Sequence, residues 1–515
     1  MSTSILFDAL DARHPDSLVF SGEKFSWHAR DVAHEIAGVS QRLEGARVMA
    51  ILADNSPDWA MADLAALKTQ TPVLPLPLFF TPAQLAHALQ QVGADLVLTD
   101  QPERILSLDI GFAVSETRRQ MVWLRRETEP VTLPAGTAKI SFTSGSTGAP
   151  KGVCLSAEGL IDTAKALKSR LADITVERHL AVLPLALLLE NSAGIYAPLL
   201  RGAEIHLPSL ARLGWQGMSG FNPASLQQAA TDVQPNSLIL VPELLKAWTL
   251  FLEKSGERAP GSLGYVAVGG ARVEPRLLAQ SRRCGLPAYQ GYGLTECGSV
   301  VSLNCPGDDA GGVGRLLPHV RAVIRQGEIH VTSRAFLGYL GDSANREGND
   351  YATGDLGYFD DDGHLHLSGR RKNLLITSFG RNISPEWVES ALLAQPDIAQ
   401  AVVVGDGQPV LTAIVVPFPG VPASQLKAAI DRVNQSLPDY ARIGHCIEAE
   451  RFTPQNGLLT GNGRPIRAAI LDRYAADLAA RYDQREPQLT AQHTTTHTTK
   501  HTPQQFTEEL SHVVL

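Results

Sequence analysis

The sequence predicts an α/β protein, with a large N-terminal domain built on parallel strands and a small α+β domain after it. The chain has 515 residues, more than one compact core usually holds, so two or more domains are expected. Before Tyr351, strand-like and helix-like segments alternate one by one, which is the pattern of parallel sheets covered by helices. After Tyr351 the strands become short and surround polar turns. We therefore place the domain boundary near Gly369.

The strands expected in the N-terminal domain are short apolar runs, and each is followed by a segment with helical periodicity. The expected strands are Val48–Leu52, Pro72–Pro77, Leu96–Leu98, Ser237–Val241 and Tyr265–Val268. The expected helices are Trp59–Lys68, Thr81–Val92, Pro242–Lys254 and Glu274–Cys284.

Two short strands, Tyr358–Phe359 and His364–Ser368, are expected before the boundary, and a compact α+β module after it, which gives domains at residues 1–368 and 369–485. The expected strands of the module are Ala401–Val404 and Val410–Val416, and its expected helices are Pro385–Leu393 and Ser424–Leu437. From Glu486 the chain becomes polar and rich in threonine. Such a segment has little apolar surface to bury, so residues 486–515 are expected to form a disordered tail.

Composition excludes several classes of protein. Hydrophobic residues make up 44% of the chain and charged residues 19%, which is typical of a globular protein and not of a disordered one. The formal net charge of -8 leaves no global basic field to attract nucleic acid or an anionic membrane. The five cysteines are scattered and form no Cys-x-x-Cys pair, so neither a disulfide framework nor a zinc site is expected.

The sequence also predicts a cytoplasmic protein without a transmembrane segment. The first residues, Met1–His14, carry several charges and lack the apolar core of a signal peptide. The longest apolar run, Leu180–Leu189, contains Pro184 and is too short to span a bilayer.

The strongest local signal is the segment Ile140–Gly152, which reads ISFTSGSTGAPKG. An apolar strand ends there in hydroxyl residues interleaved with glycines, and Lys151 follows. Glycines let backbone amides turn toward an anion, hydroxyls donate to phosphate oxygens, and the lysine supplies positive charge. The segment predicts a phosphate-binding loop, although the same composition also fits a plain Ser/Gly hairpin.

Two further segments carry polar groups on glycine-rich turns. In Tyr289–Gly298, Thr295 stands beside Glu296, a pairing that suits a phosphate contact and a Mg²⁺ ligand. In Tyr351–Gly357, Asp355 is expected on a tight turn, where it could accept hydrogen bonds from ribose hydroxyls. Taken singly, each of these segments also fits an ordinary turn.

Together and in this order, these segments closely resemble the adenylate-forming superfamily of acyl-CoA synthetases, luciferases and peptide-synthetase adenylation domains. The resemblance runs from Ser4 to Arg467 and is strongest to fatty acyl-CoA ligases, through Leu189–Asn191 and Asn456–Thr460. It implies a large domain with parallel sheets sandwiched by helices and a small mobile C-terminal lid. It also implies an AMP-forming ligase that activates a carboxylic acid with ATP and Mg²⁺ and then transfers the acyl group to a thiol.

The resemblance assigns roles to individual residues. Seven of them would form the loop over the ATP phosphates: Thr143, Ser144, Gly145, Ser146, Thr147, Gly148 and Lys151. Those near the adenine and the α-phosphate would be Gly269, Gly270, Ala271, Tyr292, Gly293 and Thr295. Glu296 would bind Mg²⁺, Asp355 and Arg370 would hold the ribose, and Lys372 would be the hinge of the small domain. The implied catalytic group is Thr147, Lys151, Glu296 and Arg464.

One position departs from the family pattern. The family's last motif reads Gly-Lys-x-x-Arg, and its lysine bridges the substrate carboxylate and the phosphate oxygens. Here Gly463–Arg467 reads GRPIR, so Arg464 stands in the place of that lysine. Arginine keeps the charge but presents a wide planar fork in place of a compact ammonium. The exchange leaves open both a working arginine and a chain that has lost the first half-reaction.

Three functions are therefore compatible with the sequence. The first is an acyl-CoA synthetase, and the second is an acyl-AMP ligase that loads the phosphopantetheine of an acyl carrier protein. The third is a nucleotide-binding pseudoenzyme, because of Arg464. In the family the segment Leu183–Gly194 lines the acyl pocket, and here it is rich in leucine and alanine. An apolar acid, fatty or aryl, is favoured, although a leucine run also fits an ordinary core.

Overall fold

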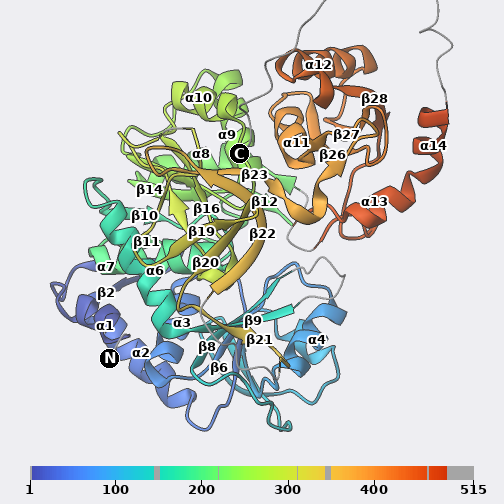
Figure 1. Ribbon diagram of the computed structural model, residues 1–515. Helices are drawn as coiled ribbons and strands as arrows, with labels where there is room; N and C mark the ends of the chain where they lie inside the picture. The colour runs from blue at the N-terminus through green and yellow to red at the C-terminus, as the bar shows by residue number, and fades with distance from the viewer. Residues whose placement is uncertain are drawn as a thin grey trace, which may run out of the picture.

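The large N-terminal part of the molecule contains two extended sheets with helices on both faces (Figure 1). The computed structural model describes residues 3–143, 151–217, 220–309, 311–342, 350–460 and 463–483. Most strand pairs at the centre of both sheets are parallel. The sheets, their helices and the separate C-terminal module confirm the predicted fold class.

The first large sheet has nine strands. Its order is β18 (Arg315–Leu316), β17 (Ser302–Leu303), β16 (Ala288–Tyr292), β15 (Tyr265–Val268), β14 (Ser237–Leu240), β10 (Arg178–Leu180), β11 (Glu204–His206), β1 (Leu18–Ser21) and β2 (Ser26–His28). The second has eight strands. Its order is β21 (Phe336–Tyr339), β9 (Lys151–Ser156), β8 (Thr137–Thr143), β4 (Val73–Pro75), β3 (Met49–Leu52), β5 (Leu96–Thr99), β7 (Met121–Arg125) and β6 (Ala113–Arg118).

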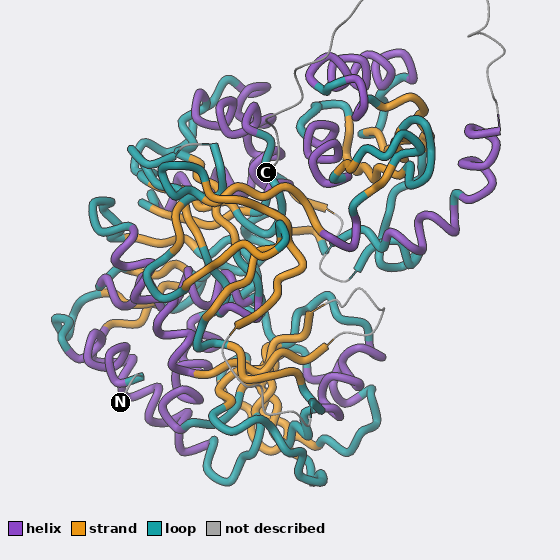
Figure 2. The backbone as a smooth tube through the Cα atoms, viewed as in Figure 1, coloured by secondary structure: helices purple, strands orange, loops and turns teal. Residues whose placement is uncertain are grey.

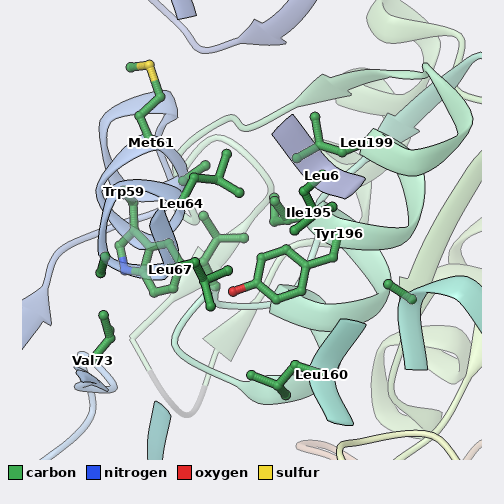
Figure 3. Close-up of a cluster of buried hydrophobic side chains, with 14 of the residues drawn as sticks. Leu6, Trp59, Met61, Leu64, Leu67, Val73, Leu160, Ile195, Tyr196 and Leu199 are labelled. Atoms are coloured by element: carbon green, nitrogen blue, oxygen red, sulfur yellow. The ribbon is translucent and has the colours of Figure 1, made fainter. Parts of the chain in front are cut away.

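A layer of helices lies between the two large sheets and forms the largest core of the molecule. The helix α3 (Pro57–Thr69) is buried on nearly every side, so its apolar residues do not form a single stripe. Its side chains Trp59, Leu64 and Leu67 pack toward Tyr196 and Ile195 (Figure 3). The other helices of this layer are α1 (Ser4–Asp11), α2 (Ala29–Arg42), α6 (Ala157–Arg170), the π-helix η1 (Glu190–Tyr196) and α7 (Ala197–Arg201).

The outer faces of the two sheets are covered by further helices (Figure 2). On the nine-stranded sheet these are α8 (Pro223–Val233), α9 (Pro242–Ser255) and α10 (Pro275–Arg283). On the eight-stranded sheet they are α4 (Pro82–Gln91) and α5 (Pro102–Leu106). None of the helices in the described residues is long and apolar enough to cross a bilayer.

A four-stranded antiparallel sheet follows the two large sheets and leads to the C-terminal module. Its strands are β19 (Arg321–Arg325), β20 (Glu328–Thr332), β22 (Asp350–Phe359) and β23 (Leu365–Arg370). Asp355 lies within β22, opposite Arg370 of β23. The expectation of a tight turn at Asp355 is therefore wrong, because Asp355 pairs with Arg370 in the ladder; the strand is irregular just before it, where Gly354 has φ +74°. The boundary predicted between residues 368 and 369 falls inside β23.

The C-terminal module is a three-stranded sheet with helices on both faces. Alternate residues of β26 (Ile398–Val404) point to opposite faces, so Ala401 and Val403 enter one core and Val402 and Val404 the other. The remaining elements are the hairpin β24 (Leu375–Ile376) and β25 (Asn382–Ile383), α11 (Pro385–Leu393), β27 (Leu411–Pro417), α12 (Ala423–Ser436), β28 (Ile443–Glu448), α13 (Arg467–Arg473) and α14 (Ala475–Asp483). The predicted tail, residues 486–515, lies outside the described residues.

Candidate active site

The arms of the expected phosphate loop are two neighbouring antiparallel strands. Thr143 ends β8, Lys151 begins β9, and the two residues pair in the ladder. The loop residues between them, Ser144, Gly145, Ser146, Thr147 and Gly148, lie outside the described residues, so their role in binding ATP stays a prediction. The ladder nevertheless fixes both ends of the segment at one edge of the sheet.

Lys151 and Glu296 come together through a tyrosine that sequence reasoning missed. The Lys151 ammonium lies 5.4 Å from the ring centroid of Tyr339, on β21. The Tyr339 hydroxyl donates a hydrogen bond of 3.0 Å to Glu296 Oε1 and lies 3.0 Å from the hydroxyl of Tyr351. Burial and the nearby Glu296 carboxylate raise the pKa of Tyr351, so its hydroxyl stays neutral. No local sequence pattern marks Tyr339, because its partners belong to other elements of the chain.

Glu296 is compatible with the predicted role of a Mg²⁺ ligand, in a site that a bound nucleotide would complete. It lies in the 3₁₀ turn η2 (Thr295–Cys297), half-buried, after Thr295. Within the described residues no group of three or more His, Cys, Asp or Glu side chains could hold a metal by itself. Mg²⁺ in nucleotide enzymes is usually bound by one or two carboxylates together with phosphate oxygens and water. A single carboxylate that shares Tyr339 as a neighbour with Lys151 is compatible with that donor set.

Asp355 is the centre of a second polar cluster. Its side chain is 8% exposed, accepts a hydrogen bond of 2.7 Å from the Tyr292 hydroxyl and pairs with Arg370 Nε at 2.8 Å. Burial raises the pKa of Asp355, and Arg370 opposes that shift. The structure thus brings together three residues that the motifs placed around the nucleotide, although the contact between Tyr292 and Asp355 was not foreseen.

Tyr292 and the segment after it lie at the carboxyl end of parallel strands. β15 and β16 are parallel neighbours, with Val268 beside Gln290, so Gly269, Gly270 and Ala271 emerge at the same edge as Tyr292. In open α/β sheets this edge is where ligands bind. The chain then folds back so closely that a Cβ on Gly293 would lie 1.6 Å from the carbonyl oxygen of Ser299. Only glycine fits there.

Arg464 reaches this edge from the C-terminal module. Its Nη2 donates a hydrogen bond of 3.3 Å to the carbonyl oxygen of Gly270. Solvent reaches the residue, yet the protein around its guanidinium lowers the pKa of Arg464, as does Arg370, while Asp355 and Glu296 raise it. The residue that departs from the family motif therefore lies among the predicted nucleotide-binding side chains. Lys372, the predicted hinge, lies exposed in the 3₁₀ turn η3 (Arg371–Asn373) between the two parts of the chain.

Two family models match this chain. One, described as AMP-binding enzyme, covers residues 7–332, and the other, described as AMP-binding enzyme C-terminal domain, covers residues 372–486. The chain belongs to the AMP-binding enzyme family. The matches confirm the resemblance to the adenylate-forming superfamily that the motifs indicated.

Individual relatives agree with this assignment. The chain is 26% identical over 432 residues to the long-chain-fatty-acid–CoA ligase FadD15 of Mycobacterium bovis, with 70% of each protein covered. It is 32% identical over 286 residues to the 2-succinylbenzoate–CoA ligase of Bacillus licheniformis, covering 52% of this chain and 56% of that one. The solved O-succinylbenzoate coenzyme A synthetase of Bacillus subtilis, in complex with AMP, matches with a TM-score of 0.72 at 22% identity, over 90% of this chain and 97% of that one. The structural likeness supports the fold.

Proposed function

We propose that this protein is an AMP-forming acid–CoA ligase. It activates a carboxylic acid with ATP to an acyl-adenylate, releases pyrophosphate and then transfers the acyl group to CoA. The observation that carries the proposal is the contact of Arg464 with Gly270. That contact brings a cation from the C-terminal module to the sheet edge where Tyr292, Asp355 and Arg370 already meet. The names of the relatives, acid–CoA ligases, support the same reaction class.

In the first half-reaction a carboxylate oxygen attacks the α-phosphorus of ATP, a P–O bond forms, and the bond to the β-phosphate oxygen breaks to release pyrophosphate. Lys151 and the loop before it hold the leaving phosphates, and Asp355 accepts hydrogen bonds from the ribose. Arg464 faces the negative charge that grows on the α-phosphate and is positioned before the reaction begins, which is how fixed cations lower such barriers. Glu296, together with phosphate oxygens, would hold Mg²⁺, which would supply further positive charge at the phosphates.

In the second half-reaction the thiol of CoA attacks the acyl carbon, a C–S bond forms, and the C–O bond to AMP breaks. The thiol proton leaves with solvent or with the departing phosphate. No nucleophile of the protein takes part. We infer that Lys372 is the hinge about which the C-terminal part, from residue 369, turns between the two steps, since it lies in the turn that joins β23 to the module.

The acid is apolar in this proposal. Leu183, Leu185 and Leu188 are buried, and a Cβ on Gly269 would lie 3.4 Å from Leu189 Cδ2. The leucine-rich segment therefore ends against the strand end that carries Gly269. An apolar segment at this position favours a fatty or aryl acid. The cytoplasmic location inferred from the sequence stays a prediction.

The decisive experiment measures acid-dependent ATP–pyrophosphate exchange with a panel of palmitate, benzoate and 2-succinylbenzoate. Arg464→Ala should lower exchange by about 10²- to 10³-fold, the usual effect of losing one preformed donor to a developing charge. Arg464→Lys should retain activity, and Arg473→Ala, at an exposed position of α13, should be unchanged.

Three results would contradict the proposal or change it. If ATP–pyrophosphate exchange survives in Arg464→Ala, another cation offsets the negative charge on the α-phosphate. No exchange from the unmutated chain, restored by Arg464→Lys, identifies a chain that has lost the first step. Thioester formation with a phosphopantetheinylated carrier protein but not with CoA would show that the acyl acceptor is a carrier protein. Glu296→Gln and Lys372→Pro then test the remaining roles: the first should abolish exchange, and the second should block only thioester formation, because proline fixes φ.

A further inference from the structure

A buried lysine of the large domain contacts the C-terminal module. Lys246 lies on α9 and is 8% exposed. Its ammonium donates hydrogen bonds of 2.7 Å to the carbonyl oxygen of Gln395 and 2.6 Å to that of Ile398. These partners are 149 and 152 residues further along the chain, in the part matched by the C-terminal family model. The contact therefore joins the two parts of the molecule.

The two carbonyl groups lie in the connection between α11 and the strand β26. α11 ends at Leu393, Gln395 lies two residues beyond it, and Ile398 is the first residue of β26. The ring of Phe418 lies 5.3 Å from the ammonium and adds a cation–π contact. Lys246 thus binds the connection between α11 and β26, in the other part of the chain.

The same helix, α9, also faces Arg464. Glu243 stands one turn before Lys246 and interacts electrostatically with both Arg464 and Lys246. Asp397, which lies between Gln395 and Ile398 in the chain, attracts the lysine and is itself bound to Arg432 of α12 at 2.8 Å. The contacts of α9 therefore hold the C-terminal module in the orientation in which Arg464 reaches Gly270.

We propose that Lys246 is a positioning residue: it docks the C-terminal module in the orientation that serves adenylate formation, and its contacts must break before thioester formation. This inference rests on the proposed function, because it assigns the observed orientation to the first half-reaction. A lysine that only stabilises the fold would affect both half-reactions alike.

Docking should also depend on pH. Burial lowers the pKa of Lys246 to about 7, and Asp397 and Glu243 oppose that shift. Once undocked, the ammonium faces water and its pKa returns toward the ordinary lysine value of about 10.4. The docked state then binds fewer protons than the undocked one, so docking strengthens as the pH rises from about 7, by up to about tenfold per unit. Below pH 7 both states carry the proton, and the dependence ends.

The test compares Lys246→Met with Lys254→Met, an exposed position in the last turn of the same helix. Lys246→Met should lower ATP–pyrophosphate exchange about tenfold, because about 1.4 kcal/mol of docking free energy is lost. It should leave thioester formation from supplied acyl-adenylate within about twofold of the wild type. The rate of ATP–pyrophosphate exchange in the wild type, divided by the rate in Lys246→Met, should rise between pH 7 and 9. Lys254→Met should behave as the wild type.

Hydrogen exchange gives a readout that needs no acid. In Lys246→Met the peptides covering residues 243–249 and 394–398 should exchange faster, while the peptide of α12 should not change. Equal losses of activity in both half-reactions, or faster hydrogen exchange in α12 as well, would show a structural role and overturn the proposal. Unchanged hydrogen exchange in both peptides, 243–249 and 394–398, would overturn it too. If no acid supports activity in the unmutated chain, the proposed function fails, while the hydrogen-exchange comparison still decides whether Lys246 docks the module.

Discussion

The substitution Asp63→Asn should destabilise the large domain strongly, because it leaves a buried lysine without its counter-charge. Lys139 of β8 and Asp63 of α3 form an ion pair of 2.7 Å, and each side chain is 1% exposed. Asn191 donates to Asp63 at 2.9 Å, and the Lys139 ammonium donates to the Tyr196 hydroxyl at 2.9 Å. Figure 3 shows that hydroxyl directed toward α3. The cluster joins α3, the π-helix η1 and the strand β8, which leads to the predicted phosphate loop.

The magnitude follows from the two ways in which the folded variant can respond. Lys139 either stays charged without a counter-ion, which costs about 3–5 kcal/mol for a broken buried pair, or it loses its proton. At pH 7.5 deprotonation costs roughly 1.4 kcal/mol for each of the approximately three pH units below the ordinary lysine pKa, about 4 kcal/mol in all. Because the smaller cost decides, we expect the free energy of unfolding to fall by about 3–4 kcal/mol.

The assay is urea unfolding followed by tryptophan fluorescence, which reports mainly on the large domain because only Trp387 of the six tryptophans lies beyond residue 368. Burial already lowers the pKa of Lys139 in the wild type, and Asp63 opposes that shift. The folded variant should therefore bind fewer protons than its unfolded chain, so its stability rises with pH and the deficit shrinks between pH 7.5 and 9.5. As a control, Asp58 lies on the same helix as Asp63 and forms an exposed pair with Arg119, which lies outside that helix. Asp58→Asn should cost less than about 1 kcal/mol. A deficit below about 1 kcal/mol for Asp63→Asn, or one that does not change with pH, would refute the reasoning.

Three further substitutions or deletions test other parts of the structure. Gly194→Ala puts a Cβ 2.1 Å from Glu190 Oε1, so urea unfolding should show a loss of about 1–3 kcal/mol; an unchanged midpoint contradicts this. Tyr339→Phe removes the hydrogen bond to Glu296 and should lower ATP–pyrophosphate exchange roughly tenfold, at an unchanged melting temperature. An exchange rate equal to that of the wild type would exclude Tyr339 from the site. Deletion of residues 486–515 should leave both stability and turnover unchanged, since a polar Thr/His tract buries little apolar area; loss of soluble expression would show that the tail docks.

The sequence by itself indicated the family and many of the elements, because both depend on short local patterns. The helix Pro385–Leu393 and the strand Tyr265–Val268 have the bounds that periodicity and flanking turn residues indicated. The motifs also named the residues that meet at the sheet edge, since the loops after parallel strands emerge on one side of a sheet. Arg464 was visible as a departure from the motif, although its contact with Gly270 was not.

Only the tertiary structure decided which of these residues touch. Asp355 looked like a turn residue, but pairing with β23 keeps it in a strand. Lys139 was a lone charge in an apolar strand until the fold brought Asp63 against it, 76 residues away in the chain. From the sequence alone, Lys246 is an ordinary charged residue of a helix. In the structure the C-terminal module covers it. Such contacts depend on how distant segments pack and on the burial that packing creates, and burial, more than residue type, determines how strongly a charge acts.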